Sequence, residues 1–300
     1  MKGNTRMKRT LMALMLVLCL ALPLLAGAEV VTLPLDFSGG LDPVSDYPAQ
    51  RDTPGYDAYE DPSITATYER VVSPEWHVTC YIARIKIANG SQLRTASFNG
   101  FDKSKGTAPT QTMARRNKAI VACNGDYFTG DAGRFVLRQG QVFRKDMREG
   151  QDVLLIDEDG DFHLILADEH PETMDKTTID GKRVNNALCF GPALIRDGEI
   201  VVDYERTQRV SHPKNREQRI AICQTGPLEY MIVTVAHWGM DLQSFTEFIA
   251  SFGNVRHAYN LDGGNSCHLV FMGNWRNKLA DEEYRNVPDI VYFASAWQAE

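Results

Sequence analysis

Two short polar turns, far apart in the sequence, place the tightest constraint on how this chain can fold. The segment Asn124–Phe128 follows the strand-like run Lys118–Cys123, and the segment Asn260–Ser266 follows the apolar run Val255–Tyr259. Each segment contains an Asn, an Asp and at least one Gly, and glycine allows a backbone to bend sharply and to approach a ligand closely. Loops of this kind usually present chemistry rather than packing. We therefore expect the fold to bring the two turns together as two halves of one site.

Alternating apolar residues and turn signals predict a strand-rich domain around these turns. Hairpins are predicted where short apolar runs flank Gln139-Gly140, Asp159-Gly160 and Asp197-Gly198. The clearest helix runs from about Leu242 to Phe252, and a second covers Thr110–Asn117. The predicted fold class is α+β, a single large mixed domain that is strand-rich, with a few helices packed on the sheet.

The strand expected near residue 80 changes phase along its length. Its apolar positions are first Val78, Cys80 and Ile82, and then Ile85 and Ile87. This change of phase predicts a β-bulge between the two sets.

The first 28 residues have the pattern of an export signal. Basic residues precede an apolar run from Leu11 to Leu25, and Ala26-Gly27-Ala28 fits a cleavage site before Glu29. An uncleaved membrane anchor is the alternative, but the run is near the lower length limit for a spanning helix. We expect a secreted or cell-envelope, extracytoplasmic protein with no stable membrane insertion after cleavage.

The predicted organisation has three parts. Residues 1–28 form the signal peptide, and residues 29–60, rich in Pro, Gly, Asp and Ser, form an N-terminal arm or linker. Residues 61–297 form the globular domain, which is long enough for a substantial core.

The net charge of the mature chain limits the kinds of molecule that it is expected to bind. The net charge is -7, and the predicted signal holds four basic residues and no acidic one, so its removal leaves about -11. A surface this acidic argues against nucleic acid or an anionic membrane as the main partner.

The cysteines predict neither a zinc ribbon nor a redox pair, because no C-x-x-C spacing occurs. An odd number remains after the signal, so at least one thiol is free or pairs between chains. We expect most of them to be small buried hydrophobes, with Cys123 and Cys267 flanking the two turns. The five are Cys80, Cys123, Cys189, Cys223 and Cys267.

The two polar turns and three further segments resemble the phosphodiester glycosidase family. The further segments, which occur in family order, are Gln92–Ala96, Phe190–Pro192 and Arg219–Ile222. The resemblance covers roughly residues 60–295. The chain departs from the family at Asn265, where a third glycine is usual, and at Asp126-Tyr127, where glycine and an aromatic residue are common.

This resemblance implies a hydrolase that acts on a carbohydrate phosphodiester, such as a sugar-1-phosphodiester of the cell wall or of an exopolysaccharide. The leaving group is a phosphomonoester, which already carries charge and needs little protonation. Such a reaction requires cationic or N–H donors for the phosphate, a carboxylate near the anomeric carbon, and amides for the sugar hydroxyls.

Two arginines are the candidate phosphate ligands. Arg219 begins a predicted strand where the family motif has its arginine, and a guanidinium matches two phosphate oxygens at once. Arg94 is the second candidate. A structural ion pair or simple packing would explain either arginine without a ligand.

Asp262 is the first candidate for the catalytic carboxylate, and Asp126 is the second. Either carboxylate would also be explained by capping of its own turn. If both carboxylates lined one pocket, their mutual repulsion would raise the pKa of one of them, and the two would form an acid/base pair.

Several other polar residues are candidates for substrate contact. Glu247, on the polar side of a predicted helix, matches an acidic family position and is the third catalytic candidate. His212 precedes the arginine strand and is a candidate substrate-binding residue or general acid. The turns themselves suit sugar hydroxyls, an acetamido group or phosphate oxygens, or they satisfy their own backbones. Their candidate residues are Asn124, Asn260, Gly263, Gly264, Asn265 and Ser266.

No required metal is predicted, because no EF-hand loop or H-E-x-x-H motif occurs. Asp126, Asp262 and the Asn carbonyls could nevertheless hold a hard divalent cation such as calcium. Two other functions therefore stay open. One is a metal-dependent phosphodiesterase that cuts the P–O bond, and the other is a non-catalytic polysaccharide-binding module with the same fold.

Overall fold

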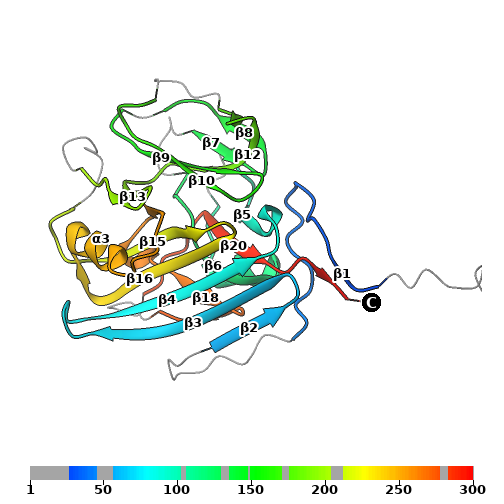
Figure 1. Cartoon of the computed structure of the whole chain (residues 1–300), viewed down its shortest axis with the longest axis horizontal. Coiled ribbons are helices and arrows are strands. Elements are labelled where there is room, and N and C mark those ends of the chain that lie inside the picture. The colour runs from blue at the N-terminus through cyan, green and yellow to red at the C-terminus, as the bar shows by residue number, and fades with distance from the viewer. Residues whose placement is uncertain are drawn as a thin grey trace, which may run out of the picture. The chain divides into compact units, whose positions relative to one another are not determined.

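A large antiparallel sheet forms the middle of the fold (Figure 1). Each strand pairs antiparallel with its neighbours. In spatial order the eight strands are β14 (Glu199–Ile200), β13 (Ala193–Arg196), β17 (His257–Asn260), β15 (Glu217–Gly226), β16 (Glu229–Met240), β4 (Val78–Ile87), β3 (Ile64–Ser73) and β2 (Asp57–Asp61).

The computed structural model describes most of the chain after the predicted signal peptide. The described residues are 27–45, 57–102, 106–129, 135–147, 149–170, 176–203, 212–277 and 283–299. Within them, Val30–Trp297 form one compact unit. The predicted signal peptide lies outside the described residues except for its last two positions.

A second, five-stranded antiparallel sheet packs against the first. Its strands, in spatial order, are β19 (Asn274–Trp275), β18 (Leu269–Phe271), β6 (Ala119–Asn124), β20 (Asp289–Ala294) and β5 (Leu93–Ser97). Side chains such as Ile85 and Ile232 from the first sheet and Val121 and Phe293 from the second share one buried cluster. The main core therefore lies between the two sheets, where the removal of apolar surface from water stabilises their packing.

Two α-helices of the described residues cover the outer faces. Helix α3 (Leu242–Ala250) buries Phe245 against the large sheet, and helix α2 (Thr110–Arg116) buries Met113 against the five-stranded sheet. Both helices lie where the sequence predicts them, and the strand-rich α+β prediction is confirmed.

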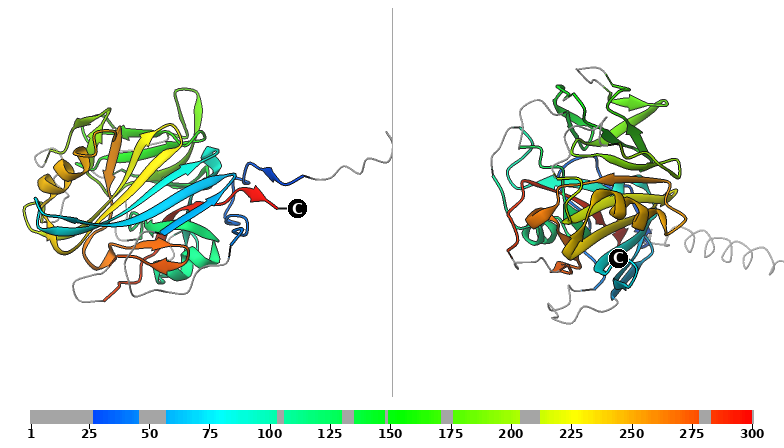
Figure 2. Two further views of the ribbon diagram at one scale, coloured as in Figure 1. Left: turned by 60° about the horizontal axis from the view of Figure 1, so that its bottom comes forward. Right: turned by 90° about the vertical axis from the view of Figure 1, so that its left-hand side faces the viewer.

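A third, six-stranded sheet lies beside these layers. Its strands are β10 (Phe162–Ile165), β9 (Val153–Asp157), β12 (Lys182–Leu188), β7 (Val136–Arg138) and β8 (Gln141–Arg144), with β11 (Thr178–Ile179) paired to β12. In the left view of Figure 2 this sheet, in green, and α2, in blue-green, lie on opposite sides of the long strands. The three predicted hairpins are confirmed as β7–β8, β9–β10 and β13–β14. Separately, β1 (Glu29–Val30) pairs with β21 (Trp297–Gln298).

The predicted bulge near residue 83 is wrong. Strand β4 pairs with β3 and β16 without any shift of register. Val78, Cys80 and Ile82 face the cluster under α3, whereas Ile85 and Ile87 face the core between the sheets. Both phases belong to one regular strand, because its two faces are covered over different parts of its length.

Of the residues predicted to form an arm or linker, the structure describes 29–45 and 57–60, and these pack on the domain. Leu33 is buried, and the backbone N–H groups of Val31 and Leu41 donate to the carbonyls of Ala296 and Ser295. Residues 57–60 already belong to the edge strand β2, so the expected boundary at residue 61 falls inside a strand. Among the described helices, none combines the length and the apolar character needed to cross a membrane.

We expect Gln92 to be a main stabilising contact between the eight-stranded and the five-stranded sheets. Its fully buried amide donates to the carbonyls of Ser63 at 3.0 Å and Ala294 at 2.9 Å and accepts from two backbone N–H groups. Gln92→Ala removes all four of these hydrogen bonds, although the Ala88 N–H still donates to the Ser63 carbonyl at 2.9 Å, and should lower the free energy of unfolding by about 3 kcal/mol. Urea unfolding measures this loss. The control Gln243→Ala removes an exposed amide that donates to Glu247 and should change stability by less than about 0.5 kcal/mol; equal losses would contradict the assignment.

Candidate functional site

The two polar turns meet at one end of the sandwich. Asn124 ends β6 in the five-stranded sheet, and Asn260 ends β17 in the large sheet. The Asn124 side-chain amide donates to the carbonyl of Asp262 at 2.8 Å, and its Oδ1 accepts from the backbone N–H of His268 at 3.1 Å. One asparagine therefore joins the first turn to both ends of the second, and the expectation that the fold unites the turns is met.

The Gly263-Gly264 bend passes close to the start of β15. A Cβ on Gly263 would lie 2.5 Å from the carbonyl oxygen of Gln218, closer than any side chain allows. Gly264 has a φ of +57°, a conformation that favours glycine. The bend thus places Asp262, Asn265 and the backbone N–H groups next to the strand that carries Arg219.

The segment Phe190–Pro192 forms a third side of this region. The Asn260 amide donates to the carbonyl of Gly191 at 2.8 Å, and the Asn260 backbone N–H donates to Pro192 at 3.0 Å. Among the described residues, the Asn260 Oδ1 has no hydrogen-bond partner although the side chain is buried. A buried acceptor of this kind suits a ligand hydroxyl or N–H group.

Arg219 supplies positive charge beside the second turn. Its side chain is 6% exposed and donates to three carbonyls, those of Met240 at 3.2 Å, His212 at 2.8 Å and Asn215 at 3.2 Å. Burial raises the pKa of the Cys267 thiol. The negative charge of Asp262 raises this pKa further, and the positive charge of Arg219 lowers it. Opposite charges therefore act on one buried thiol.

Arg285 is a second arginine at the same turn, and the sequence analysis missed it. Its Nη1 donates to Ser266 Oγ at 3.2 Å, and its backbone N–H donates to the carbonyl of Asn265 at 2.9 Å. Arg285 stands in a polar stretch without periodicity, so no sequence pattern points to it.

His268 holds the second turn through hydrogen bonds, and the sequence analysis did not identify it either. Its Nε2 lies 2.9 Å from the Asn265 carbonyl and its Nδ1 2.7 Å from the Thr110 hydroxyl. Because a carbonyl can only accept, Nε2 carries the proton. Burial lowers the pKa of His268 to about 3, so the ring is neutral near pH 7.

Residues 117–294 match the family model described as phosphodiester glycosidase. The chain belongs to the phosphodiester glycosidase family. A search of curated proteins finds no match. The matched segment contains both polar turns, Arg219 and Arg285.

Solved structures share the fold at low sequence identity. The catalytic domain of zebrafish N-acetylglucosamine-1-phosphodiester alpha-N-acetylglucosaminidase is similar with a TM-score of 0.59 and 17% identity, over 89% of this chain and 98% of that one. A hypothetical protein from Synechocystis is similar with a TM-score of 0.56 and 16% identity, over 80% of this chain and 64% of that one. This chain therefore spans less than two thirds of the Synechocystis protein.

Asp126, expected beside Asp262, instead points into the interior of this family member. Its Oδ1 lies 2.7 Å from Arg138 Nη2, and its Oδ2 accepts from the backbone N–H of Cys189 at 2.8 Å. Both Asp126 and Arg138 are fully buried. A second carboxyl group, that of Asp289, faces the same arginine: its Oδ2 lies 3.5 Å from Arg138 Nη2. We name Asp126, Arg138 and Asp289 the buried triad.

Asp126 and Asp262 do not form the acid/base pair considered from the sequence. The carboxyl groups that repel each other are those of Asp126 and Asp289 in the buried triad. Burial raises the pKa of Asp289 to about 7, with the charge of Asp126 adding to the rise and Arg138 opposing it. A Cβ on Gly125 would lie 2.2 Å from the Asp289 carboxylate, so glycine is required there. Arg138 and Asp289 carry no sequence signal of their own, because each is a single charged residue at the end of an apolar strand.

Arg94 and Glu247 are not brought to the turns. Arg94 is fully buried near the opposite end of β5 and donates to the carbonyls of Pro34, Asp36 and Ser91. Glu247 is exposed on α3 and accepts from Gln243 at 2.9 Å. His212 does lie close, since its carbonyl binds Arg219, but its side chain is exposed.

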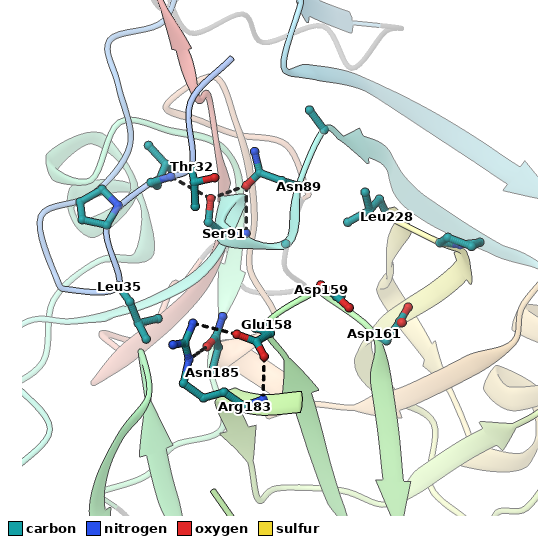
Figure 3. A pocket seen from close by; sticks show the side chains of 15 residues that line it. Thr32, Leu35, Asn89, Ser91, Glu158, Asp159, Asp161, Arg183, Asn185 and Leu228 are labelled. Carbon is teal, nitrogen blue, oxygen red and sulfur yellow. Dashed lines mark hydrogen bonds and ion pairs between the residues drawn. The ribbon is translucent and has the colours of Figure 1, made fainter. Parts of the chain in front are cut away.

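A large hollow of the described chain lies away from this site. It has a volume of about 770 Å³ and lies between residues 32–35, the 3-10 helix η1 (Gly90–Gln92) and the β9–β10 turn (Figure 3). Arg183 in its wall is already paired with Glu158 at 3.2 Å and bonded to Asn185 at 3.1 Å. None of the predicted site residues lines it. In the described part of the chain, no His, Cys, Asp and Glu side chains form a group of three that could hold a metal ion.

The buried triad predicts a pH-dependent stability. Unfolded Asp289 loses its proton near pH 3.9, whereas the folded protein keeps it to about pH 7, so this group makes the fold less stable as pH rises through that window. Asp289→Asn should remove the effect, so its free energy of unfolding relative to wild type should rise by about 3 kcal/mol from pH 4.5 to pH 8. Urea unfolding at both pH values measures the gain.

Asp126→Asn is the matched comparison, because it leaves Arg138 without its nearest carboxylate. It should cost about 3 kcal/mol at pH 4.5 and less at pH 8, because without the Asp126 charge Asp289 ionises more readily and compensates Arg138. A pH-independent difference between Asp289→Asn and wild type would show that Asp289 is ionised throughout.

Proposed function

We propose that this protein is an exported hydrolase that cleaves the glycosidic C–O bond of sugar-1-phosphodiesters, releasing a sugar and a phosphomonoester. The observation that carries the proposal is the junction of the two turns, where Asp262, Arg219 and the Ser266–Arg285 pair surround one glycine bend. Family membership and the fold shared with the zebrafish glycosidase domain support it. The substrates would be carbohydrate phosphodiesters of the cell wall or of an exopolysaccharide type, in an extracytoplasmic compartment.

Asp262 is the proposed catalytic residue. It is half-buried, so its carboxylate can reach substrate while the surrounding protein strengthens its field. It would activate water at the anomeric carbon or stabilise positive charge that develops there. The phosphate leaves with its negative charge and needs no strong acid, which agrees with a turn that holds a single carboxylate.

The phosphate would be held by cations and N–H donors of the second turn. Arg285, held by the buried Ser266 hydroxyl, would bind its oxygens, and Arg219 would add positive charge from β15. This local charge opposes the acidic surface of the whole chain. Asn260 and Asn265 would bind sugar hydroxyls, while Asn124 and Asp126 would hold the first turn in place.

Arg285 allows a test of phosphate binding that spares the fold. Arg285→Gln removes the charge from an exposed side chain and should lower kcat/KM by about 10- to 100-fold, the value of one charge-assisted hydrogen bond. The matched control is Arg256→Gln, an exposed arginine before β17, which should leave kcat/KM unchanged. Steady-state kinetics on a sugar-1-phosphodiester measures both, and equal values would remove Arg285 from the site.

Hydrolysis in heavy-oxygen water tests the bond that breaks. If Asp262 acts at the anomeric carbon, the label must enter the sugar and not the phosphomonoester. Asp262→Asn should reduce kcat by about 100-fold or more with little change in melting temperature, since the turn keeps its shape. Mass spectrometry of the products and thermal unfolding measure the two effects.

Other outcomes point to the other functions. Label in the phosphate, together with loss of activity in a chelator, would replace this proposal with a metal-dependent phosphodiesterase. No turnover of any sugar-1-phosphodiester would favour a polysaccharide-binding module.

A further inference from the structure

A cavity of about 570 Å³ opens two strands away from the catalytic turns. Its walls come from residue 37 of the N-terminal segment, the end of β5, the end of α2 and the start of β8. Its volume lies in the range of small-molecule sites. The lining residues are Phe37, Ala96, Ser97, Asn99, Gly100, Phe101, Asp102, Arg116, Asn117, Gln141 and Phe143.

Three phenyl rings form an aromatic wall in this cavity. The ring centroids of Phe37 and Phe101 are 5.6 Å apart, those of Phe101 and Phe143 5.7 Å, and those of Phe37 and Phe143 6.2 Å. Phe101 is buried and anchored on Phe128 at 5.0 Å, whereas Phe37 is 44% exposed. An exposed ring on a fixed base offers a flat apolar surface that a ligand can cover.

The remaining lining groups are hydrogen-bonding and nearly neutral in sum. Asn99 and Gln141 are exposed amides, and Asp102 and Arg116 carry one charge of each sign. Such a set does not favour an anion or a cation. The rings are tilted by 43° to 55° to one another, so the flat surface is the exposed face of Phe37. One aromatic face beside amides and a carboxylate matches a pyranose ring, which presents C–H groups on its face and hydroxyls around its edge.

The cavity lies near the turns at which the reaction is proposed to occur. Asn124 of β6 pairs with Ile290 of β20, and Ser97 of β5 pairs with the adjacent Asp289. The cavity wall and the first turn therefore lie at the same end of the sheet, two strands or about 10 Å apart. Phe101 also lies under Arg138 of the buried triad, at 5.3 Å.

We infer that this cavity is a second carbohydrate-binding subsite, which holds a neutral sugar residue of an extended substrate while the phosphodiester lies at the glycine turn. The inference rests on the proposed function for the class of ligand. It specifies a substrate longer than a single sugar phosphodiester, because one sugar cannot reach both places.

Binding of neutral oligosaccharides tests the subsite without any turnover. Calorimetric titration and saturation-transfer NMR of the purified protein would use maltotriose and chitotriose as probes and cyclohexanol as an apolar control. We expect at least one trisaccharide to bind. Phe37→Ala should weaken it about tenfold and Asp102→Asn several-fold. Ile200→Ala, which removes a side chain of equal 44% exposure on β14, should bind as wild type does.

Three results would overturn the subsite: neither trisaccharide binds, Phe37→Ala and Asp102→Asn bind as tightly as Ile200→Ala, or cyclohexanol binds as tightly as the trisaccharides. Because binding is read without hydrolysis, these results do not bear on the catalytic proposal. Conversely, Phe37-dependent binding in a protein that fails to hydrolyse sugar-1-phosphodiesters would uphold the subsite and reject the catalytic proposal.

Discussion

The neutralisation of one buried arginine organises the region around the two turns. Arg138 is fully buried on β7, and a cation in such a place requires a carboxylate partner. Asp126 provides it from the turn after β6, and Asp289 provides weaker compensation from β20. The ion pair therefore joins the six-stranded sheet to the end of the five-stranded sheet and fixes the position of the first turn, which carries Asp126.

The effect of this ion pair extends to the second turn through the backbone. The second oxygen of Asp126 accepts from Cys189, which directly precedes Phe190–Pro192. The carbonyl of Gly191 in that segment accepts from Asn260, at the start of the second turn. A continuous series of hydrogen bonds thus connects the buried triad with the glycine bend, so that all three sheets fix the position of Asp262. Rigid support of this kind keeps reacting groups within the narrow geometry that catalysis needs.

Sequence reasoning located the fold class, both helices and the junction of the two turns, because these depend on local patterns. Apolar periodicity identifies α3, and an Asn beside a Gly at a strand end identifies each turn. It failed where a residue's role depends on what approaches it from elsewhere in the chain. Asp126 has the sequence context of an exposed turn residue, yet Arg138 draws it inward. Arg94 matches a ligand-type arginine, yet carbonyls of the N-terminal segment surround it. Arg285 becomes part of the site only because β20 returns beside β6.

The contacts of the N-terminal segment also govern the order in which the protein can fold. Val31 and Leu41, early in the chain, donate to Ala296 and Ser295 at its other end, and Gln92 binds Ala294. The strand β20, which ends at Ala294 just before Ser295 and Ala296, lies between β5 and β6 in the five-stranded sheet. The sheet therefore stays open in the middle until β20 is available, and long-range pairings of this kind form slowly. A chain that emerges gradually from a ribosome or a secretion channel would leave the facing edges of β5 and β6 unpaired until β20 arrives, and unpaired strand edges of this kind promote aggregation.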